Sequence, residues 1–264
     1  MVVRKNDIVY DTDKNLKTDI YFPNDTSSDT KILIFWHGGG WFRGSKVAAK
    51  KMGIRFANAG FMTFIPEYSL APSQIFPEAH NDANQFVKWL LKSEYTDDDD
   101  QKNIVQIGAS VGGTMALNIA GKYGFPTVTW SAPVDFSDWM KKHKDVKPSF
   151  EAKDELGLTE PHEINNAFYK YFTLTYAGAN DPKILKKMDA ASYDYSNLKE
   201  LMMINSADEL TPLKSVLNFV DFLAQKNLGV ELLVIKGYGH AMDYASDYVD
   251  ESLDFLYQTI KRQK

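Results

Sequence analysis

Short, uninterrupted apolar runs set the strongest limit on how this chain can fold. Residues 31–36 (KILIFW), 61–66 (FMTFIP) and 103–109 (NIVQIGA) are rich in β-branched and aromatic side chains. A strand shows a continuous apolar run, without alternation, when both of its faces are buried, as in a parallel sheet. Segments with helical periodicity separate these runs. The sequence therefore predicts right-handed crossovers and a mostly parallel sheet with helices on both faces.

Alternating patterns extend this sheet toward the N-terminus. The segments DIVYD (7–11) and KTDIYFP (17–23) alternate apolar and polar residues, which favours half-buried antiparallel strands. Further strands are expected in PTVTWSAP, LMMINSAD and VELLVIKG. Helices are expected over 46–59, 77–93, 111–123, 212–226 and 241–262. The predicted fold class is α/β, with a central sheet of about eight strands in one domain spanning residues 1–264.

A long polar and aromatic segment, residues 135–195, interrupts this rhythm between two predicted strands. Its central part, INNAFYKYFTLTY, keeps several aromatic side chains close together. We therefore interpret the segment as a cap-like helical insertion after the sixth strand.

Composition and charge exclude several classes of protein. The chain has 264 residues, 44% of them hydrophobic, and a net charge of −5, and no basic stripe points to nucleic acid. The absence of cysteine excludes disulfides and thiolate chemistry. The N-terminus lacks the apolar core of a secretory signal, and no apolar run is long enough to cross a membrane. We expect a cytoplasmic protein that requires no metal or other cofactor.

The stretch Gly108-Ala-Ser110-Val-Gly112 places a hydroxyl at a strand-to-helix junction. Small neighbours at 108 and 112 permit a sharp turn that exposes the serine at the carboxyl edge of the sheet, beside a helix N-terminus. A glycine-rich turn with an incidental serine is the alternative interpretation of this five-residue pattern.

A serine nucleophile needs a base and a carboxylate to orient that base. Of the five histidines, His240 follows the last predicted strand in the glycine-containing loop IKGYGH, which places it at the same sheet edge. For the carboxylate, Asp208 ends an apolar run directly before the strand that leads to His240. Asp135 also follows a strand and fits the chain order, and Glu209 is adjacent to Asp208. Of the three we favour Asp208.

Three consecutive glycines follow the predicted strand 31–36, in the motif FWHGGGW. Their N–H groups, together with that of Val111 after the serine, are suited to bind a developing oxyanion. A phosphate-binding loop is the alternative, but neither a following Lys-Ser/Thr nor a GxGxxG pattern is present.

These motifs resemble those of a known family. His37-Gly38-Gly39-Gly40, YSLAPSQIFPEAHND, GASVGG, SADELTP and GYGH are similar to segments of hormone-sensitive-lipase-like and related small esterases of the α/β-hydrolase fold. The resemblance implies Ser110 as nucleophile, His240 as base and Asp208 as the orienting carboxylate, and amide donors from Gly39, Gly40 and Val111. The tryptophan in HGGGW is also similar to that of arylformamidases and of feruloyl- or acetyl-esterase-like enzymes.

The expected activity is hydrolysis of short-chain acyl esters through an acyl-enzyme. Trp41 and the insertion 135–195 should cover the site. The aromatic residues of the insertion either line an acyl pocket or form its own small core; they are Phe136, Trp139, Phe168, Tyr169, Tyr171 and Phe172. Arylformamidase, peptidase and a non-catalytic ligand-binding protein are the alternatives. The expected partner is a small-molecule ester, with no nucleic acid and no membrane, and a homo-oligomer is left open.

Overall fold

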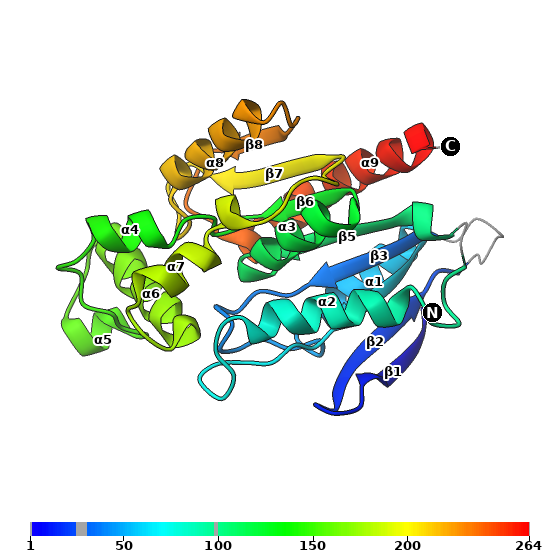
Figure 1. Ribbon diagram of the computed structural model, residues 1–264, viewed down its shortest axis with the longest axis horizontal. Helices are drawn as coiled ribbons and strands as arrows, with labels where there is room; N and C mark the ends of the chain where they lie inside the picture. Colours follow the sequence, from blue (N-terminus) through cyan, green and yellow to red (C-terminus); the bar gives the residue numbers. More distant parts are fainter. Residues whose placement is uncertain (1, 25–30, 98–99, 264) are drawn as a thin grey trace.

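A mostly parallel sheet forms the centre of the computed structural model, which describes residues 2–24, 31–97 and 100–263. Within these ranges, eight strands are joined in the order β1-β2-β4-β3-β5-β6-β7-β8 (Figure 1). The first two strands are antiparallel to their neighbours, and the other pairings are parallel. The bounds are β1 Val3–Asp11, β2 Leu16–Phe22, β3 Lys31–Trp36, β4 Phe61–Pro66, β5 Ile104–Ala109, β6 Thr127–Trp130, β7 Leu201–Ser206 and β8 Glu231–Ile235. The predicted fold class is confirmed.

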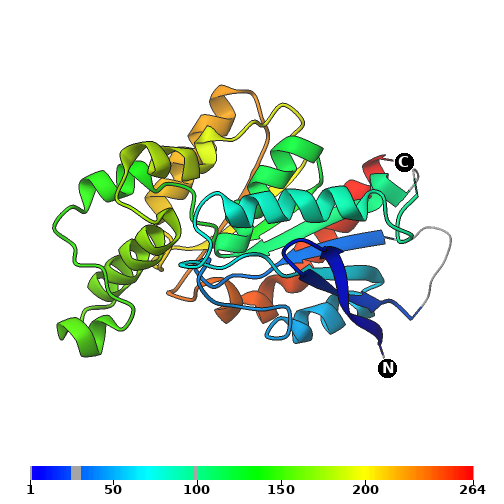
Figure 2. The same ribbon diagram turned by 60° about the horizontal axis from the view of Figure 1, so that its bottom comes forward.

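Helices cover both faces of the sheet. Helices α1 and α9 pack on one face, and α2, α3 and α8 pack on the other (Figure 2). The sequence of β3 does not alternate between apolar and polar residues, because both faces of the strand are buried. Its side chains at 32, 34 and 36 enter the core beneath α2 and α3, and those at 33 and 35 enter the core beneath α1 and α9. The bounds are α1 Lys50–Asn58, α2 Glu78–Leu90, α3 Val111–Tyr123, α8 Leu213–Gln225 and α9 Ala245–Gln263.

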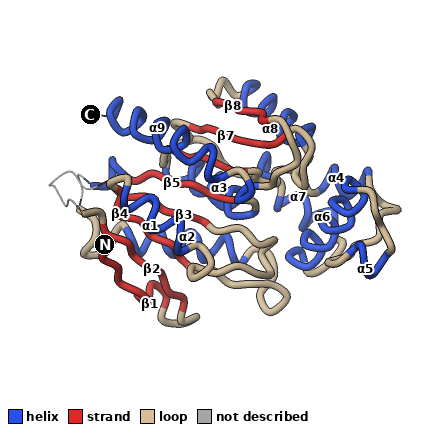
Figure 3. Tube along the Cα trace, turned by 180° about the vertical axis from the view of Figure 1, so that it is seen from behind, coloured by secondary structure: helices blue, strands red, loops and turns tan. Residues whose placement is uncertain are grey.

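The segment between β6 and β7 forms a helical insertion at one end of the sheet (Figures 1 and 3). Its helices are α4 Ser137–Lys142, α5 Ala152–Leu156, α6 Pro161–Ala177 and α7 Pro182–Met188. The two ends of the insertion meet at a narrow neck. There, the Ala190 N–H donates to the Val134 carbonyl (3.0 Å) and the Phe136 N–H donates to the Asp189 carboxylate (2.7 Å). The insertion therefore leaves and rejoins the sheet at one place.

No helix in the described part of the chain combines the length and the apolar character that a membrane span requires.

Candidate active site

Ser110 occupies a strained turn between β5 and α3. Its φ of 52° and ψ of −127° lie outside the regions that side-chain-bearing residues normally adopt. The flanking glycines make this turn sterically possible. A Cβ on Gly108 would lie 2.4 Å from the Gly112 carbonyl oxygen, and a Cβ on Gly112 would lie 2.2 Å from the Trp36 carbonyl oxygen. The small residues around Ser110 thus let α3 begin directly against β3 and β5.

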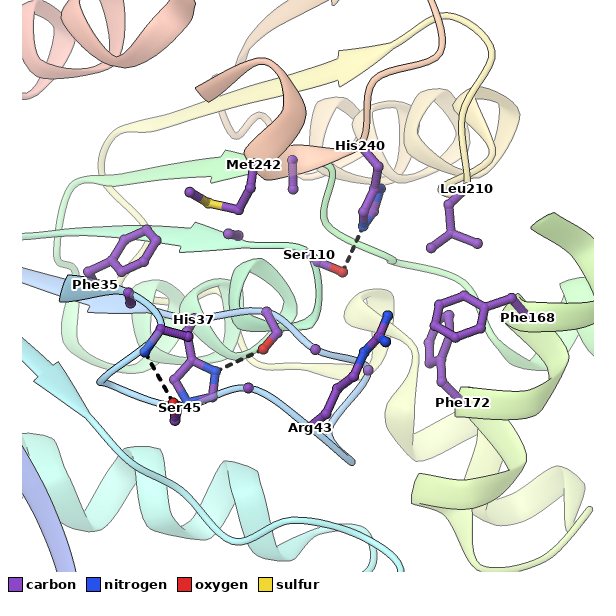
Figure 4. Close-up of a pocket in the computed structure, with 18 residues that line it drawn as sticks. Phe35, His37, Arg43, Ser45, Ser110, Phe168, Phe172, Leu210, His240 and Met242 are labelled. Carbon is purple, nitrogen blue, oxygen red and sulfur yellow. Dashed lines mark hydrogen bonds between the residues drawn. The ribbon is translucent and has the colours of Figure 1, made fainter. Parts of the chain in front are cut away.

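His240 lies within hydrogen-bonding distance of Ser110. It follows β8, and its Nε2 is 2.9 Å from Ser110 Oγ. A dashed line marks this hydrogen bond in Figure 4. The His240 backbone N–H donates to the Asp243 carboxylate (2.9 Å), which fixes the loop that carries the imidazole. The structure therefore brings together two side chains that are 130 positions apart in the sequence.

Glu209, rather than Asp208, orients the imidazole. Its Oε2 accepts a short hydrogen bond from His240 Nδ1, and its Oε1 accepts from Ser131 Oγ (2.6 Å) and from the Ser206 N–H (3.0 Å). The Glu209 side chain is fully buried. Because a carboxylate only accepts, His240 Nδ1 carries the proton and Nε2 is free to accept one from Ser110.

The prediction that Asp208 contacts His240 is wrong. Asp208 is exposed, and its backbone N–H donates to the Gly237 carbonyl (3.2 Å). The turn after β7 directs position 208 toward solvent and returns position 209 to the interior. Glu209 is the alternative that the sequence offers by its position next to Asp208. No further signal in the sequence separates two adjacent carboxylates whose directions depend on one turn.

Asp135, the other alternative, belongs to a different environment. Its carboxylate accepts from the Asp138 N–H (3.1 Å) and lies 3.4 Å from Ser215 Oγ. Burial raises the pKa of Asp135, and the nearby charge of Asp189 raises it further. Its partners at the base of the insertion do not include His240.

The glycine loop after β3 lies against Ser110. A Cβ on Gly38 would lie 3.0 Å from Ser110 Cβ, so the loop backbone is in close contact with the turn that carries Ser110. Gly39 and Gly40 have φ values of 120° and 62°, which favour glycine. Val111 is the first residue of α3, where the backbone N–H has no partner within the helix. This arrangement is compatible with the predicted oxyanion donors, whose role stays a prediction.

The His37 side chain is hydrogen-bonded to the backbone of the glycine loop. Its ring is buried and stacks on Tyr68, with centroids 4.4 Å apart, and its Nδ1 donates to the Gly38 carbonyl (2.8 Å). Burial lowers the pKa of His37 to about 4, and the bond to Gly38 opposes this shift only in part. The ring is therefore neutral near pH 7 and does not place a cation beside Ser110.

Trp41 does not line the candidate site, so the prediction that it binds substrate is wrong. Its indole is fully buried and stacks on Tyr176 of α6, with centroids 4.3 Å apart. It also lies near Phe136 and Phe172. The positive φ values at Gly40 and Trp41 turn the chain so that the indole enters the contact between the glycine loop and the insertion. Trp41 therefore joins the insertion to the sheet domain.

A pocket of about 270 Å³ opens above Ser110. Phe168 and Phe172 of α6 line one side of it, and Leu210 and Met242 contribute further apolar surface (Figure 4). The other aromatic residues expected to border the site do not line it. Phe136, Trp139 and Tyr169 pack on one another and form a core within the insertion.

Within the described residues, no three His, Asp or Glu side chains are grouped so that they could hold a metal ion.

Solved structures with the same architecture extend over nearly the whole chain. An esterase from Pyrobaculum calidifontis covers 100% of this chain and 84% of its own, with a TM-score of 0.71 and 20% identity. Esterase B from Lactobacillus rhamnosis covers 99% of this chain and 87% of its own, with a TM-score of 0.74 and 14% identity. The chain is also similar to ethyl acetate hydrolase from Pseudomonas putida, with 23% identity over 87% of this chain and 71% of that protein.

The sheet order and the hydroxyl, imidazole and carboxylate at its edge define the class as an α/β hydrolase. The BD-FAE family model matches residues 18–124, and the model of the prolyl oligopeptidase family matches residues 78–263, more than half of the chain. The chain therefore belongs to the prolyl oligopeptidase family. The resemblance to α/β-hydrolase esterases seen in the motifs is confirmed.

Proposed function

We propose that the protein is a serine carboxylesterase that hydrolyses short-chain acyl esters through an acyl-enzyme. The observation that supports this most directly is the chain of hydrogen bonds from Ser110 through His240 to the buried Glu209. Such a chain supplies a nucleophile, a base and a group that fixes the tautomer of the base. The triad is thus Ser-His-Glu rather than the Ser-His-Asp expected from the sequence.

The reaction begins when Ser110 Oγ attacks the ester carbonyl carbon while its proton passes to His240 Nε2. Glu209 stabilises the resulting imidazolium, and the N–H groups of Gly39, Gly40 and Val111 bind the oxyanion of the tetrahedral intermediate. Each such donor typically contributes about 3 to 4 kcal/mol to stabilisation of the transition state. His240 then protonates the alcohol as the ester C–O bond breaks. Water repeats the attack on the acyl-enzyme and releases the acid.

The size and lining of the pocket favour a short acyl chain. A volume of about 270 Å³, bordered by Phe168, Phe172 and Leu210, accommodates a few methylene groups beside Ser110. A series of p-nitrophenyl esters from acetate to laurate should therefore give its highest kcat/KM among the short esters. A maximum among the long esters would contradict this assignment.

The direct test is Ser110→Ala. This variant should unfold at nearly the wild-type temperature but lose both hydrolysis of p-nitrophenyl butyrate and labelling by a fluorophosphonate probe. In the wild type, peptide mapping should locate the label on Ser110. Full activity of Ser110→Ala, or labelling at another residue, would overturn the proposal.

Peptide hydrolysis is a second candidate, because the prolyl oligopeptidase family model covers residues 78–263. No carboxylate is among the residues that line the pocket, so none is placed there to bind a peptide amine. Glu67, which follows β4, lies 3.8 Å from Lys46 and does not line the pocket. Acyl esters, formyl amides and peptides assayed side by side should show a clear preference for esters.

A further inference from the structure

Arg43 is the one permanently charged side chain among the residues that line the pocket above Ser110. It belongs to the same loop as the glycines, and its backbone N–H donates to the Gly39 carbonyl (3.1 Å). Figure 4 shows the side chain extending from this loop toward the space between Ser110 and Phe168. The cation and the nucleophile therefore face the same small cavity.

The Arg43 guanidinium is held by aromatic rings rather than by a carboxylate. Its Cζ lies 5.4, 5.2 and 5.4 Å from the ring centroids of Phe42, Phe150 and Phe168. Across residues 2–24, 31–97 and 100–263, no ion pair or hydrogen bond of its guanidinium is seen. Cation–π contacts position the group without supplying an acceptor for its N–H donors. Those donors remain free to bind a group that enters the pocket.

A carboxylate is the ligand that best matches these donors. The planar guanidinium binds a carboxylate through two parallel hydrogen bonds, and Arg43 is exposed at the pocket, where an entering carboxylate can reach it. The site offers one cation, which balances a monoanion. An ester short enough for the cavity would place such a carboxylate near Arg43 while its carbonyl lies at Ser110.

We infer that Arg43 selects esters whose acyl part ends in a carboxylate, that is, half-esters of short dicarboxylic acids. This inference rests on the proposed esterase function and specifies its substrate class. Arg43 contacts the end of the substrate remote from the scissile bond, so it determines specificity and takes no part in the chemical steps.

The test compares two esters that differ only at the far end of the acyl chain. Mono-p-nitrophenyl glutarate carries a terminal carboxylate, and p-nitrophenyl pentanoate carries a methyl group of similar reach. The wild type should show a higher kcat/KM for the glutarate ester. In Arg43→Gln the ratio of the two kcat/KM values should fall by about threefold to fivefold, because a charge-assisted pair at an exposed side chain is lost. Arg43→Lys should retain part of the preference, because it keeps the charge but not the planar fork.

Lys50→Gln is the matched control. Lys50 is exposed at the start of α1 and does not line the pocket, so this variant removes one positive charge without altering the cavity. Its ratio should stay at the wild-type value. An equal fall in Lys50→Gln would mean that the overall field, and not Arg43 itself, attracts the anion, and would overturn the inference.

Two other outcomes separate this inference from the proposed function. If Arg43→Gln lowers kcat/KM for both esters equally, Arg43 only stabilises the conformation of the loop. That result would overturn the inference but not the proposed esterase function. If the wild type hydrolyses neither ester, the proposed function fails. A binding measurement then tests the inference. Monomethyl glutarate, titrated calorimetrically into Ser110→Ala, should bind about threefold to fivefold more weakly after Arg43→Gln is added. Equal binding by the two proteins would overturn the inference.

Discussion

The two oxygens of the Glu209 carboxylate have different partners. Oε2 faces His240, and Oε1 is held by Ser131 Oγ and the Ser206 N–H. Hydrogen bonds to both oxygens fix the rotamer of the buried side chain, so the imidazole is held in one orientation. Asp208, the preceding residue, is exposed to solvent and takes no part in this arrangement.

At this scale we predict opposite outcomes for two adjacent substitutions. Glu209→Gln should lower kcat by a large factor, up to about 10⁴, because an amide no longer enforces the tautomer that leaves Nε2 free. Asp208→Asn should change kcat by no more than about twofold, as is usual for an exposed side chain. Steady-state kinetics with p-nitrophenyl butyrate measure both. A larger loss in Asp208→Asn than in Glu209→Gln would restore the original prediction.

The elements around Ser110 depend on close backbone contact. Helix α3 begins against the carboxyl ends of β3 and β5, at a spacing that glycine permits. The Trp36 carbonyl oxygen lies 2.2 Å from where a Cβ on Gly112 would be, and this oxygen is backbone and cannot rotate away. A side chain here would push α3 away from the sheet and carry Ser110 with it.

Gly112→Ala should therefore destabilise the fold by about 1 to 3 kcal/mol and lower esterase activity, because overpacking forces a backbone shift. Gly229→Ala is the control, since Gly229 has an ordinary φ and a Cβ there would meet nothing within 4 Å. Urea unfolding should show little change for Gly229→Ala, or a slight gain in stability. Equal urea midpoints of unfolding for the two variants would argue against close packing at the turn that carries Ser110.

Local sequence patterns predicted the bounds of an element well where hydrophobic periodicity sets them. They did less well where a contact with a distant residue sets the bound. Helix α3 spans Val111–Tyr123 as expected, whereas α1 begins at Lys50 rather than at 46. The Lys46 side chain is buried between Asp7 (2.9 Å) and Asp19 (3.1 Å), and this contact with the N-terminal strands holds the chain outside the helix. Ser110 and His240 could be predicted from their motifs, because each motif is local in sequence. The direction of the Glu209 side chain and the burial of Trp41 could not, because each depends on how a turn packs in the folded protein.

At the scale of the whole molecule, buried aromatic and polar contacts attach the insertion to the sheet domain. His80 on α2 bonds to Tyr176 of α6 (2.9 Å) and to Tyr193 (3.0 Å), using both ring nitrogens. Trp41 stacks on the same Tyr176. Burial lowers the pKa of His80 from its ordinary 6.5 to about 3, so the ring is neutral in the folded protein.

This neutral histidine makes stability depend on pH. Between about pH 6.5 and pH 3, the unfolded chain binds a proton at His80 that the folded chain does not, so the free energy of unfolding falls as the pH falls. His37, with a pKa of about 4, contributes in the same direction. His80→Gln should reduce this slope by up to about 1.4 kcal/mol per pH unit. Urea titrations at pH 6.5 and 5 measure it, and an unchanged slope in the variant would show that folding does not alter proton binding at His80.

The narrow neck of the insertion has an evolutionary consequence. Because the Ala190–Val134 and Asp189–Phe136 bonds bring both ends of the inserted helices together, a descendant could lengthen, shorten or exchange them without moving β6, β7 or the reactive groups. The pocket wall that Phe168 and Phe172 supply can then change by inheritance separately from Ser110, His240 and Glu209.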